Sequence, residues 1–264
     1  MSKQSMTILV IGPTGSIGSL VVEEALRQGH SVRALVRSQE KARCLPAKAE
    51  AVIGDLTRSD TLGAAVTDID AIVFTHGSDG AGRIGSETVD YGGVRNVLAT
   101  LGSQKARIAL MTAIGVTNRT GFYNRSTESH DWKRRAERLV RASGCPYTIV
   151  RPGWFGYNKA DEHKLVFLQG DTRQAGNSSD GVIDRRQLAQ VLVSSLTSDE
   201  ALRKTFESVA TKGPAQEDLD ALFAALDPDS NGGLDGVRDS PNQPLEDEPQ
   251  RVKDDLNAVS INGR

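Results

Sequence analysis

Three glycines at a regular spacing carry the strongest chemical signal in the chain. Gly12, Gly15 and Gly18 come directly after a β-branched run, residues 7–11, and open a segment with helical periodicity, residues 16–27. Glycine permits a tight turn there, lets the backbone approach a pyrophosphate, and lets the helix pack on the strand. The free N–H groups and the positive dipole end of the helix then favour an anion. The loop predicts a dinucleotide site contacted by Gly12, Thr14, Gly15, Ser16, Ile17 and Gly18.

The end of the second predicted strand selects between NAD and NADP. An acidic side chain at this point would accept hydrogen bonds from a ribose 2′-hydroxyl and would repel a 2′-phosphate. The sequence has Arg37 and Ser38 there instead, with Arg33 earlier in the strand and Lys41 just beyond it. A guanidinium can hold a phosphate through two parallel hydrogen bonds. NADP is therefore the predicted cofactor and NAD stays possible. The alternative is an exposed basic strand end that binds no ligand.

These residues need a sheet that brings the strand ends together. Short apolar runs alternate with helical segments, and this alternation predicts a Rossmann-type α/β fold with a doubly wound parallel sheet of six to seven strands. The predicted strands are residues 7–11, 31–36, 51–53, 71–74, 108–112 and 147–150, with a seventh at 205–209. The predicted helices among them are residues 16–27, 39–44, 60–65, 87–101 and 128–142.

The pattern of elements changes in the last part of the chain. We expect residues 1–213 to form the nucleotide-binding domain, including a substrate-side segment at 154–204 with a helix near 186–196. Residues 214–264 are expected to form a helix at 216–226 followed by a polar, acidic and partly flexible extension, because few apolar residues remain there.

Composition excludes several classes of function. The 32 basic residues are balanced by 34 acidic ones and form no basic block, so no nucleic-acid partner is predicted. No apolar stretch approaches the length of a membrane span, and the start of the chain has no room for a signal region, so we expect a cytoplasmic protein that binds no membrane. Cys44 and Cys145 are expected to be reduced thiols. Residues 227–235 are similar to the start of a calcium loop, but Arg238 occupies the place of its closing glutamate, so no metal is predicted.

The spacing of the glycines in residues 12–18 resembles the phosphate loop of extended and atypical short-chain dehydrogenases/reductases, particularly their NmrA-like branch of NAD(P)-binding proteins. Four later segments agree with that family, and the resemblance covers about residues 7 to 211: Gly54-Asp55-Leu56, Val-Asp-Tyr-Gly-Gly-Val-Arg-Asn at 89–96, Asp-Trp-Lys-Arg-Arg-Ala-Glu at 131–137, and Tyr-Thr-Ile-Val-Arg-Pro-Gly at 147–153. The resemblance implies that Asp55 and Leu56 lie at the adenine side. It also implies that the inner side of the cofactor is lined by Thr75, His76, Gly77, Pro152 and Gly153.

The resemblance is incomplete at the residues that carry catalysis. Active family members use a Tyr-x-x-x-Lys pair on one helix face, where the ammonium lowers the pKa of the phenol, and a Ser or Thr on the preceding strand orients the substrate. Lys133 matches the lysine, but Ser129 occupies the tyrosine position. Thr112 is the hydroxyl nearest the usual serine position, although Ala113 is an equally good match in sequence. Lys133 and Thr112 are the candidate catalytic residues, and Lys133 is also a candidate cofactor contact.

Other interpretations of these side chains stay open. Lys133 could instead form a surface pair with Glu137, one helical turn later. His76 could act as an acid or base near neutral pH, or serve as a packing residue. Tyr123, Tyr157 and His130 could each replace the missing phenol, and the sequence does not rank them.

Two main classes of function follow from this combination. The first is an NADP-dependent reductase that acts on a small carbonyl, quinone or flavin-like acceptor, for which water can supply the proton that tyrosine would otherwise donate. The second is a non-catalytic NAD(P)-binding redox sensor that a protein partner recognises, and the missing tyrosine favours it. The family resemblance also implies a third option, a reductase or isomerase of a nucleotide-sugar or isoprenoid substrate, although family members of that kind usually retain the tyrosine. A monomer is slightly preferred over a homodimer. The arginine-rich helix through which the family pairs, at 128–142, would need acidic partners.

Overall fold

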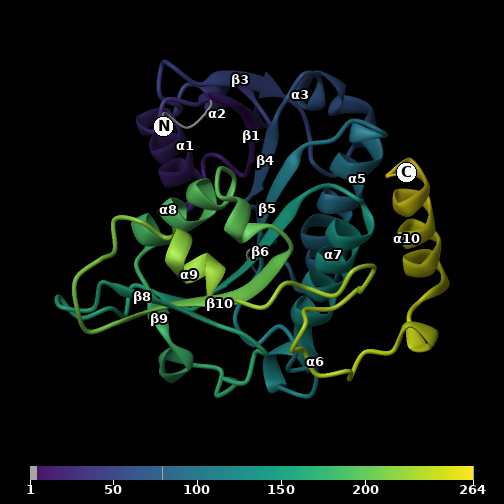
Figure 1. Cartoon of the computed structure of the whole chain (residues 1–264). Coiled ribbons are helices and arrows are strands. Elements are labelled where there is room, and N and C mark those ends of the chain that lie inside the picture. Colours follow the sequence, from purple (N-terminus) through teal and green to yellow (C-terminus); the bar gives the residue numbers. More distant parts are fainter. Residues whose placement is uncertain (1–4, 79, 264) are drawn as a thin grey trace.

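The computed structural model describes residues 5–78 and 80–263, and within them one sheet has helices on both faces (Figure 1). The strand order is β3-β2-β1-β4-β5-β6-β10-β9-β7, and β8 pairs with β10 off this path. From β1 the chain moves outward to β3 and then crosses back to β4, so the predicted doubly wound Rossmann-type fold is confirmed. Residues 1–4, the start of the predicted nucleotide-binding domain, lie outside the described residues.

All seven predicted strands are present, and each is parallel to its neighbours along the path from β3 to β10. They are β1 (Thr7–Ile11), β2 (Ser31–Val36), β3 (Glu50–Ile53), β4 (Ala71–Phe74), β5 (Arg107–Met111), β6 (Tyr147–Pro152) and β10 (Lys204–Thr211). The sequence does not predict three short strands, which are β7 (Trp154–Phe155), β8 (Lys164–Leu168) and β9 (Val182–Ile183). A two-residue strand has no alternation to recognise, and β8 lies among polar residues.

Helices cover both faces of the sheet, which explains why its central strands are continuously apolar. They are α1 (Gly18–Arg27), α2 (Gln39–Ala42), α3 (Gly63–Val66), α4 (Gly82–Gly85), α5 (Gly92–Leu101), α6 (Phe122–Thr127), α7 (Ser129–Ala142), α8 (Arg185–Ser195), α9 (Asp220–Ala224) and α10 (Gln250–Asn262). In Figure 1, α1 and α8 lie on one face, and α5 and α7 lie on the other. None of the helices in the described part of the chain has the length and apolarity that crossing a membrane requires.

Three helix predictions need correction. The helix expected at 87–101 is divided into a π-helical turn, η2 (Ser86–Tyr91), and α5. The helix expected at 60–65 is a 3₁₀ turn (Ser59–Thr61) followed by α3, and the one at 216–226 is reduced to α9. Glycines at 85, 92 and 93 flank the π turn, and π turns inside helices are common at functional sites.

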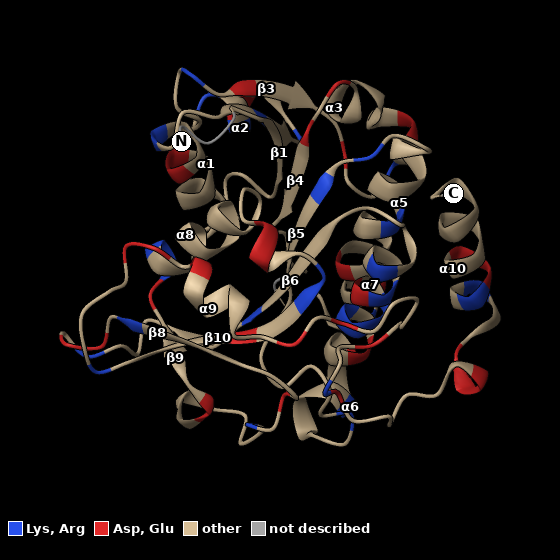
Figure 2. Ribbon diagram, viewed as in Figure 1, with Lys and Arg blue, Asp and Glu red and all other residues tan. Residues whose placement is uncertain are grey.

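The C-terminal extension docks against α7 rather than standing apart from the domain. Its acidic residues lie along the arginine-rich helix (Figure 2), and α10 packs on the outer side of α5 and α7. α10 is not among the helices expected from the sequence, although Val252, Leu256 and Val259 have helical spacing and are buried in the core.

The calcium-like run uses its carboxylates to bind arginines. Asp229 accepts from Arg141 at 3.2 Å, and Asp235 accepts from both Arg134 and Arg138, at 3.0 Å and 2.8 Å. The acidic partners that the arginine face of α7 needs are therefore supplied by the same chain.

Candidate functional site

The glycine loop has no room for side chains at two of its three glycines. Gly12 has φ of +83°, and a Cβ there would lie 2.9 Å from the backbone nitrogen of His76. A Cβ on Gly18 would lie only 1.9 Å from the carbonyl oxygen of Gly12. Gly15 is exposed, and its N–H donates to that same carbonyl at 3.1 Å. The loop therefore folds tightly on itself and leaves its outer backbone open.

The first turn of α1 presents unpaired donors to this open side. The backbone N–H groups of Ser16, Ile17 and Gly18 make no hydrogen bond to a described residue, and no side chain caps the helix. Thr14 and Ser16 are exposed beside them. A helix start with free N–H groups and a positive dipole end fits the pyrophosphate of a dinucleotide.

The sheet register brings the ends of four strands to the same edge. Ile11 pairs with Leu35 and with Phe74, so the glycine loop lies between Arg37 on one side and Thr75 and His76 on the other. Val36 pairs with Ile53, which places Asp55 next to Arg37. The carboxyl edge of a doubly wound sheet is where ligands bind such folds.

Arg37 is exposed and forms no hydrogen bond or ion pair with any described residue. Arg33, which the sequence places in the same basic group, has a structural role instead. Its guanidinium binds Glu50 at 3.0 Å and donates to carbonyls at the end of α3. Ser38 caps α2, where its hydroxyl accepts from the backbone of Lys41 at 3.3 Å. Arg37 is thus the guanidinium left available at this strand end.

The turn after β3 is held in shape by its own hydrogen bonds. Both the backbone N–H and the hydroxyl of Thr57 donate to Asp55, and these bonds, with a weaker contribution from Arg37, lower the pKa of that carboxyl. Asn96, the last residue of the family-like segment on α5, donates to the carbonyl of Leu56 at 3.0 Å. The turn predicted to face the adenine is therefore fixed from both sides.

Thr75 and His76 connect β4 to the glycine loop. The hydroxyl of Thr75 is buried and donates to the carbonyl of Ile11 at 2.9 Å. The Nε2 atom of His76 lies 3.1 Å from the carbonyl oxygen of Val89, so Nε2 carries the proton in this contact. Burial, with a smaller contribution from the positive charge of Lys133, lowers the pKa of His76 to about 4 against the opposing effect of Asp90. His76 is therefore neutral at pH 7 and is not available there as an imidazolium general acid.

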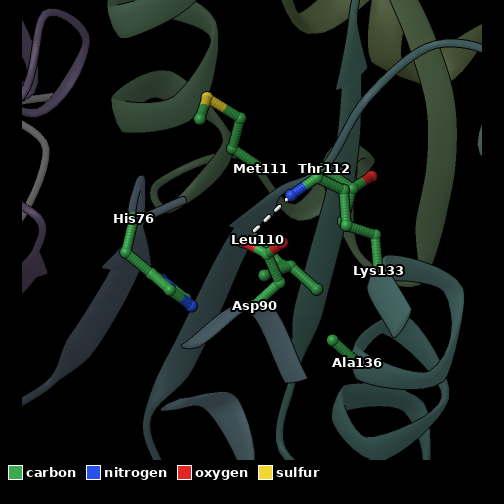
Figure 3. Close-up of a pocket in the computed structure, with 7 residues that line it drawn as sticks. All are labelled: His76, Asp90, Leu110, Met111, Thr112, Lys133 and Ala136. Carbon is green, nitrogen blue, oxygen red and sulfur yellow. Dashed lines mark ion pairs between the residues drawn. The ribbon is translucent and has the colours of Figure 1, made fainter. Parts of the chain in front are cut away.

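A small pocket opens beside His76 and contains both candidate catalytic residues (Figure 3). It is lined by His76, Asp90, Leu110, Met111, Thr112, Lys133 and Ala136. The Nζ atom of Lys133 lies 3.1 Å from Oδ1 of Asp90, a buried carboxylate that also accepts from the backbone and hydroxyl of Ser78. The alternative pairing of Lys133 with Glu137 is wrong, because Glu137 faces the interior.

Thr112 contributes its hydroxyl to that interior. It donates to Oε1 of Glu137 at 2.8 Å, and Glu137 in turn binds Arg151 and Arg141. All three of these charged residues are buried, and the two arginines hold the pKa of Glu137 low against the effect of its burial. The proton of Thr112 is therefore committed to Glu137, and its oxygen lone pairs remain for the pocket.

The residues that could replace the missing tyrosine lie outside the pocket lining. Ser129, which occupies the tyrosine position, is buried at the start of α7. The rings of His130 and Tyr123 pack against each other with their centroids 5.4 Å apart. Burial lowers the pKa of His130. Tyr123 and Tyr157 expose 52% and 60% of their surface, so neither phenol is buried against the pocket.

The loops that follow β6 and β5 are fixed by close backbone packing and by a buried carboxylate. A Cβ on Gly153 would lie 2.6 Å from the carbonyl oxygen of Gly181, so the turn after Pro152 packs directly on the backbone that leads into β9. Asp171, fully buried, accepts from the backbone of Gly115 at 2.6 Å and from the backbone and hydroxyl of Thr117. Sequence reasoning missed Asp171, which has no motif around it. It also missed the role of Asp90, which lies within the family-like segment at 89–96.

Comparisons with known proteins agree with this geometry. A family described as NAD(P)H-binding matches residues 12–199. An uncharacterized sugar epimerase, YhfK of Bacillus subtilis, is 31% identical over 82% of this chain and 100% of its own. Sanguinarine reductase of Eschscholzia californica is 26% identical over 85% of this chain and 97% of its own.

A solved structure shares the fold. The oxidoreductase ylbE of Lactococcus lactis superposes with a TM-score of 0.67 at 18% identity, over 85% of this chain and 100% of its own. The predicted family is confirmed: this chain belongs to the NAD(P)H-binding family of atypical short-chain dehydrogenases/reductases.

Proposed function

We propose that the chain is an NADPH-dependent reductase of the NmrA-like type that acts on a small carbonyl, quinone or flavin-like acceptor. The observation that carries this proposal is the continuous series of available groups along one sheet edge. It starts at Arg37, passes the open turn of α1, and ends at the pocket that holds Lys133 and Thr112.

The chain's own residues fit the parts of NADPH in turn. Gly12 and Gly18 let the loop pack closely on the start of α1 and on the end of β4, and the free N–H groups of α1 suit a pyrophosphate. The guanidinium of Arg37, which forms no ion pair with a described residue, suits a 2′-phosphate, because no acidic residue occupies the end of β2 itself. When bound, the reduced nicotinamide would supply a hydride, which is one proton with two electrons, to the acceptor.

The pocket residues then have distinct tasks. Lys133, whose side chain is 20% exposed and anchored by Asp90, can donate to ribose hydroxyls or to an acceptor oxygen. Neutral His76 offers Nδ1, which is buried without a partner among the described residues, as a hydrogen-bond acceptor. No phenol lines the pocket, so the acceptor takes its proton from Lys133 or from water.

The second candidate function is a non-catalytic NAD(P)-binding redox sensor. The specific observation in its favour is that Ser129 replaces the tyrosine while Lys133 is paired with Asp90, an arrangement that would bind ribose without chemistry.

Turnover assays separate the two functions. The protein is mixed with NADPH or NADH and with panels of quinones, flavins, aldehydes and iminium dyes, and the loss of reduced nicotinamide absorbance is followed. The reductase proposal predicts turnover with at least one acceptor class and a lower KM for NADPH than for NADH. Tight NADPH binding without turnover on every panel would contradict it and favour the sensor.

A further inference from the structure

The extension beyond the family core contains carboxylates that are as buried as core residues. The family match ends at residue 199, yet the side chains of Asp239 and Glu248 are only 2% and 1% exposed. Each binds a buried arginine of the family core. A buried carboxylate held in this way is costly to keep unless its geometry is well satisfied, so its partners are strongly specified.

The contacts of Asp239 lead directly to the pocket. Its two oxygens bind the two terminal nitrogens of Arg151, each at 2.7 Å. The same guanidinium binds Glu137 through Nε at 3.0 Å and through a terminal nitrogen at 2.7 Å. Glu137 then accepts the hydroxyl proton of Thr112 at 2.8 Å. Three consecutive charge-assisted contacts therefore join the extension to a residue that lines the pocket.

The contacts of Glu248 do not reach the pocket. Its oxygens bind Arg135 at 2.6 Å and Arg138 at 2.8 Å, and it also accepts from Gln243. None of these residues lines the pocket or binds Thr112. Asp239 and Glu248 are thus two carboxylates of matched burial and charge, of which Asp239 connects to the pocket and Glu248 does not. Asp229 also reaches Glu137, through Arg141, but over longer contacts of 3.2 Å and 3.3 Å.

We infer that Asp239 is a positioning residue for the pocket, acting through Arg151 and Glu137 to keep the hydroxyl proton of Thr112 turned inward. This inference rests on the proposed function only in regarding the pocket as the site of reduction. With Asp239 in place, both edges of Arg151 are occupied and Glu137 is held rigidly. Arg151 also contacts Glu207 at 3.3 Å, so without Asp239 that contact can draw the guanidinium away from Glu137, and the carboxylate that fixes Thr112 loses its orientation. The extension is in this sense part of the site.

The test compares Asp239→Asn with Glu248→Gln as the matched control. The chain has three methionines, and Met111 lies next to Thr112 in the pocket lining. Methyl-labelled methionine therefore gives a sparse NMR spectrum in which the Met111 signal reports on the pocket without any cofactor. We expect Asp239→Asn and Thr112→Val to shift the Met111 signal, and Glu248→Gln to leave it unchanged.

Steady-state kinetics give a second measurement, which would not change if the role of Asp239 were purely structural. With NADPH and an active acceptor, we expect Asp239→Asn to lower kcat about tenfold while the Kd for NADPH changes less than about threefold. In a Thr112→Val background, the same substitution should have no further effect on kcat, because both changes remove one interaction. If no acceptor is turned over, the proposed function fails, but the Met111 signal still tests the coupling.

A second substitution, which keeps the carboxylate, tests the inference if Asp239→Asn does not fold. A Cβ on Gly236 would lie 3.0 Å from Oδ2 of Asp239, so Gly236→Ala displaces this carboxylate without removing its charge. It should shift the Met111 signal in the same direction. Equal Met111 shifts in the Asp239 and Glu248 variants, or no shift in either Asp239→Asn or Gly236→Ala, would overturn the inference.

Discussion

The lowered pKa of His76 makes a quantitative prediction about folding stability. The imidazole has a pKa of about 4 in the folded protein, because of its burial and the nearby charge of Lys133, against about 6.5 in the unfolded chain. Between these two values the unfolded chain takes up a proton that the folded protein does not. The free energy of unfolding should therefore fall as the pH is lowered through this window.

The size of the effect follows from the same two values. A difference of about 2.5 pKa units corresponds to roughly 3 kcal/mol when the window is crossed completely, at about 1.4 kcal/mol per unit. Between about pH 7.5 and pH 5, the expected loss is about 2 kcal/mol. His76→Gln keeps a donor for the carbonyl of Val89 but cannot titrate, so it should lack this loss.

Urea unfolding at a series of pH values measures the effect. The quantity to plot is the stability of the wild type minus that of His76→Gln, because other titrating groups then cancel. His163→Gln, which removes an exposed imidazole outside the pocket, is the control for loss of a histidine. A wild-type minus His76→Gln difference that does not change with pH, or that rises toward acid, would refute the assignment of a buried neutral ring.

Three further predictions concern the core and the loop. Burial raises the pKa of Glu207 to about 7, so the wild type should gain stability relative to Glu207→Gln as the pH falls from about 7 to 4.5, the opposite sign to His76; unfolding curves with the opposite slope would contradict this. Gly18→Ala should weaken NADPH binding more than about tenfold because its Cβ meets the Gly12 carbonyl, whereas Gly63→Ala, which meets nothing within 4 Å, should leave the Kd unchanged in calorimetry. Lys133→Met should destabilise the protein by about 2 kcal/mol by leaving Asp90 unpaired, and adding Asp90→Asn should restore more than half of that loss; strictly additive effects in chemical unfolding would argue against the pair.

Much of the nucleotide side of the site can be predicted from the sequence, because it depends on backbone and on position along the chain. Gly12 and Gly18 are needed for close backbone contacts, and such contacts depend on spacing that the sequence displays. Arg37 follows a strand whose end is set by its apolar run. Patterns of this kind predict the structure well because the contacts that they require join residues close together in the chain.

Three residues of the pocket, His76, Thr112 and Lys133, follow from the family resemblance, but their partners could not be predicted, because these come from distant segments. Lys133 pairs with Asp90 rather than with Glu137, and a π turn that carries Asp90 interrupts the expected helix. Periodicity alone does not distinguish such a turn from a regular helix. Glu137 is on a helix that looks like a charged surface, yet it is buried because Arg151 and the acidic extension surround it.

The central claim is that this chain binds NADPH with its phosphate held by Arg37, and the most direct test is a pair of dissociation constants. Isothermal titration of the wild type and of Arg37→Ala with NADPH and with NADH gives the preference for each protein. We predict that the wild type binds NADPH at least about tenfold more tightly than NADH, and that Arg37→Ala removes this preference while its NADH affinity is retained. Equal or tighter NADH binding by the wild type, or an NADPH preference that survives in Arg37→Ala, would contradict the account.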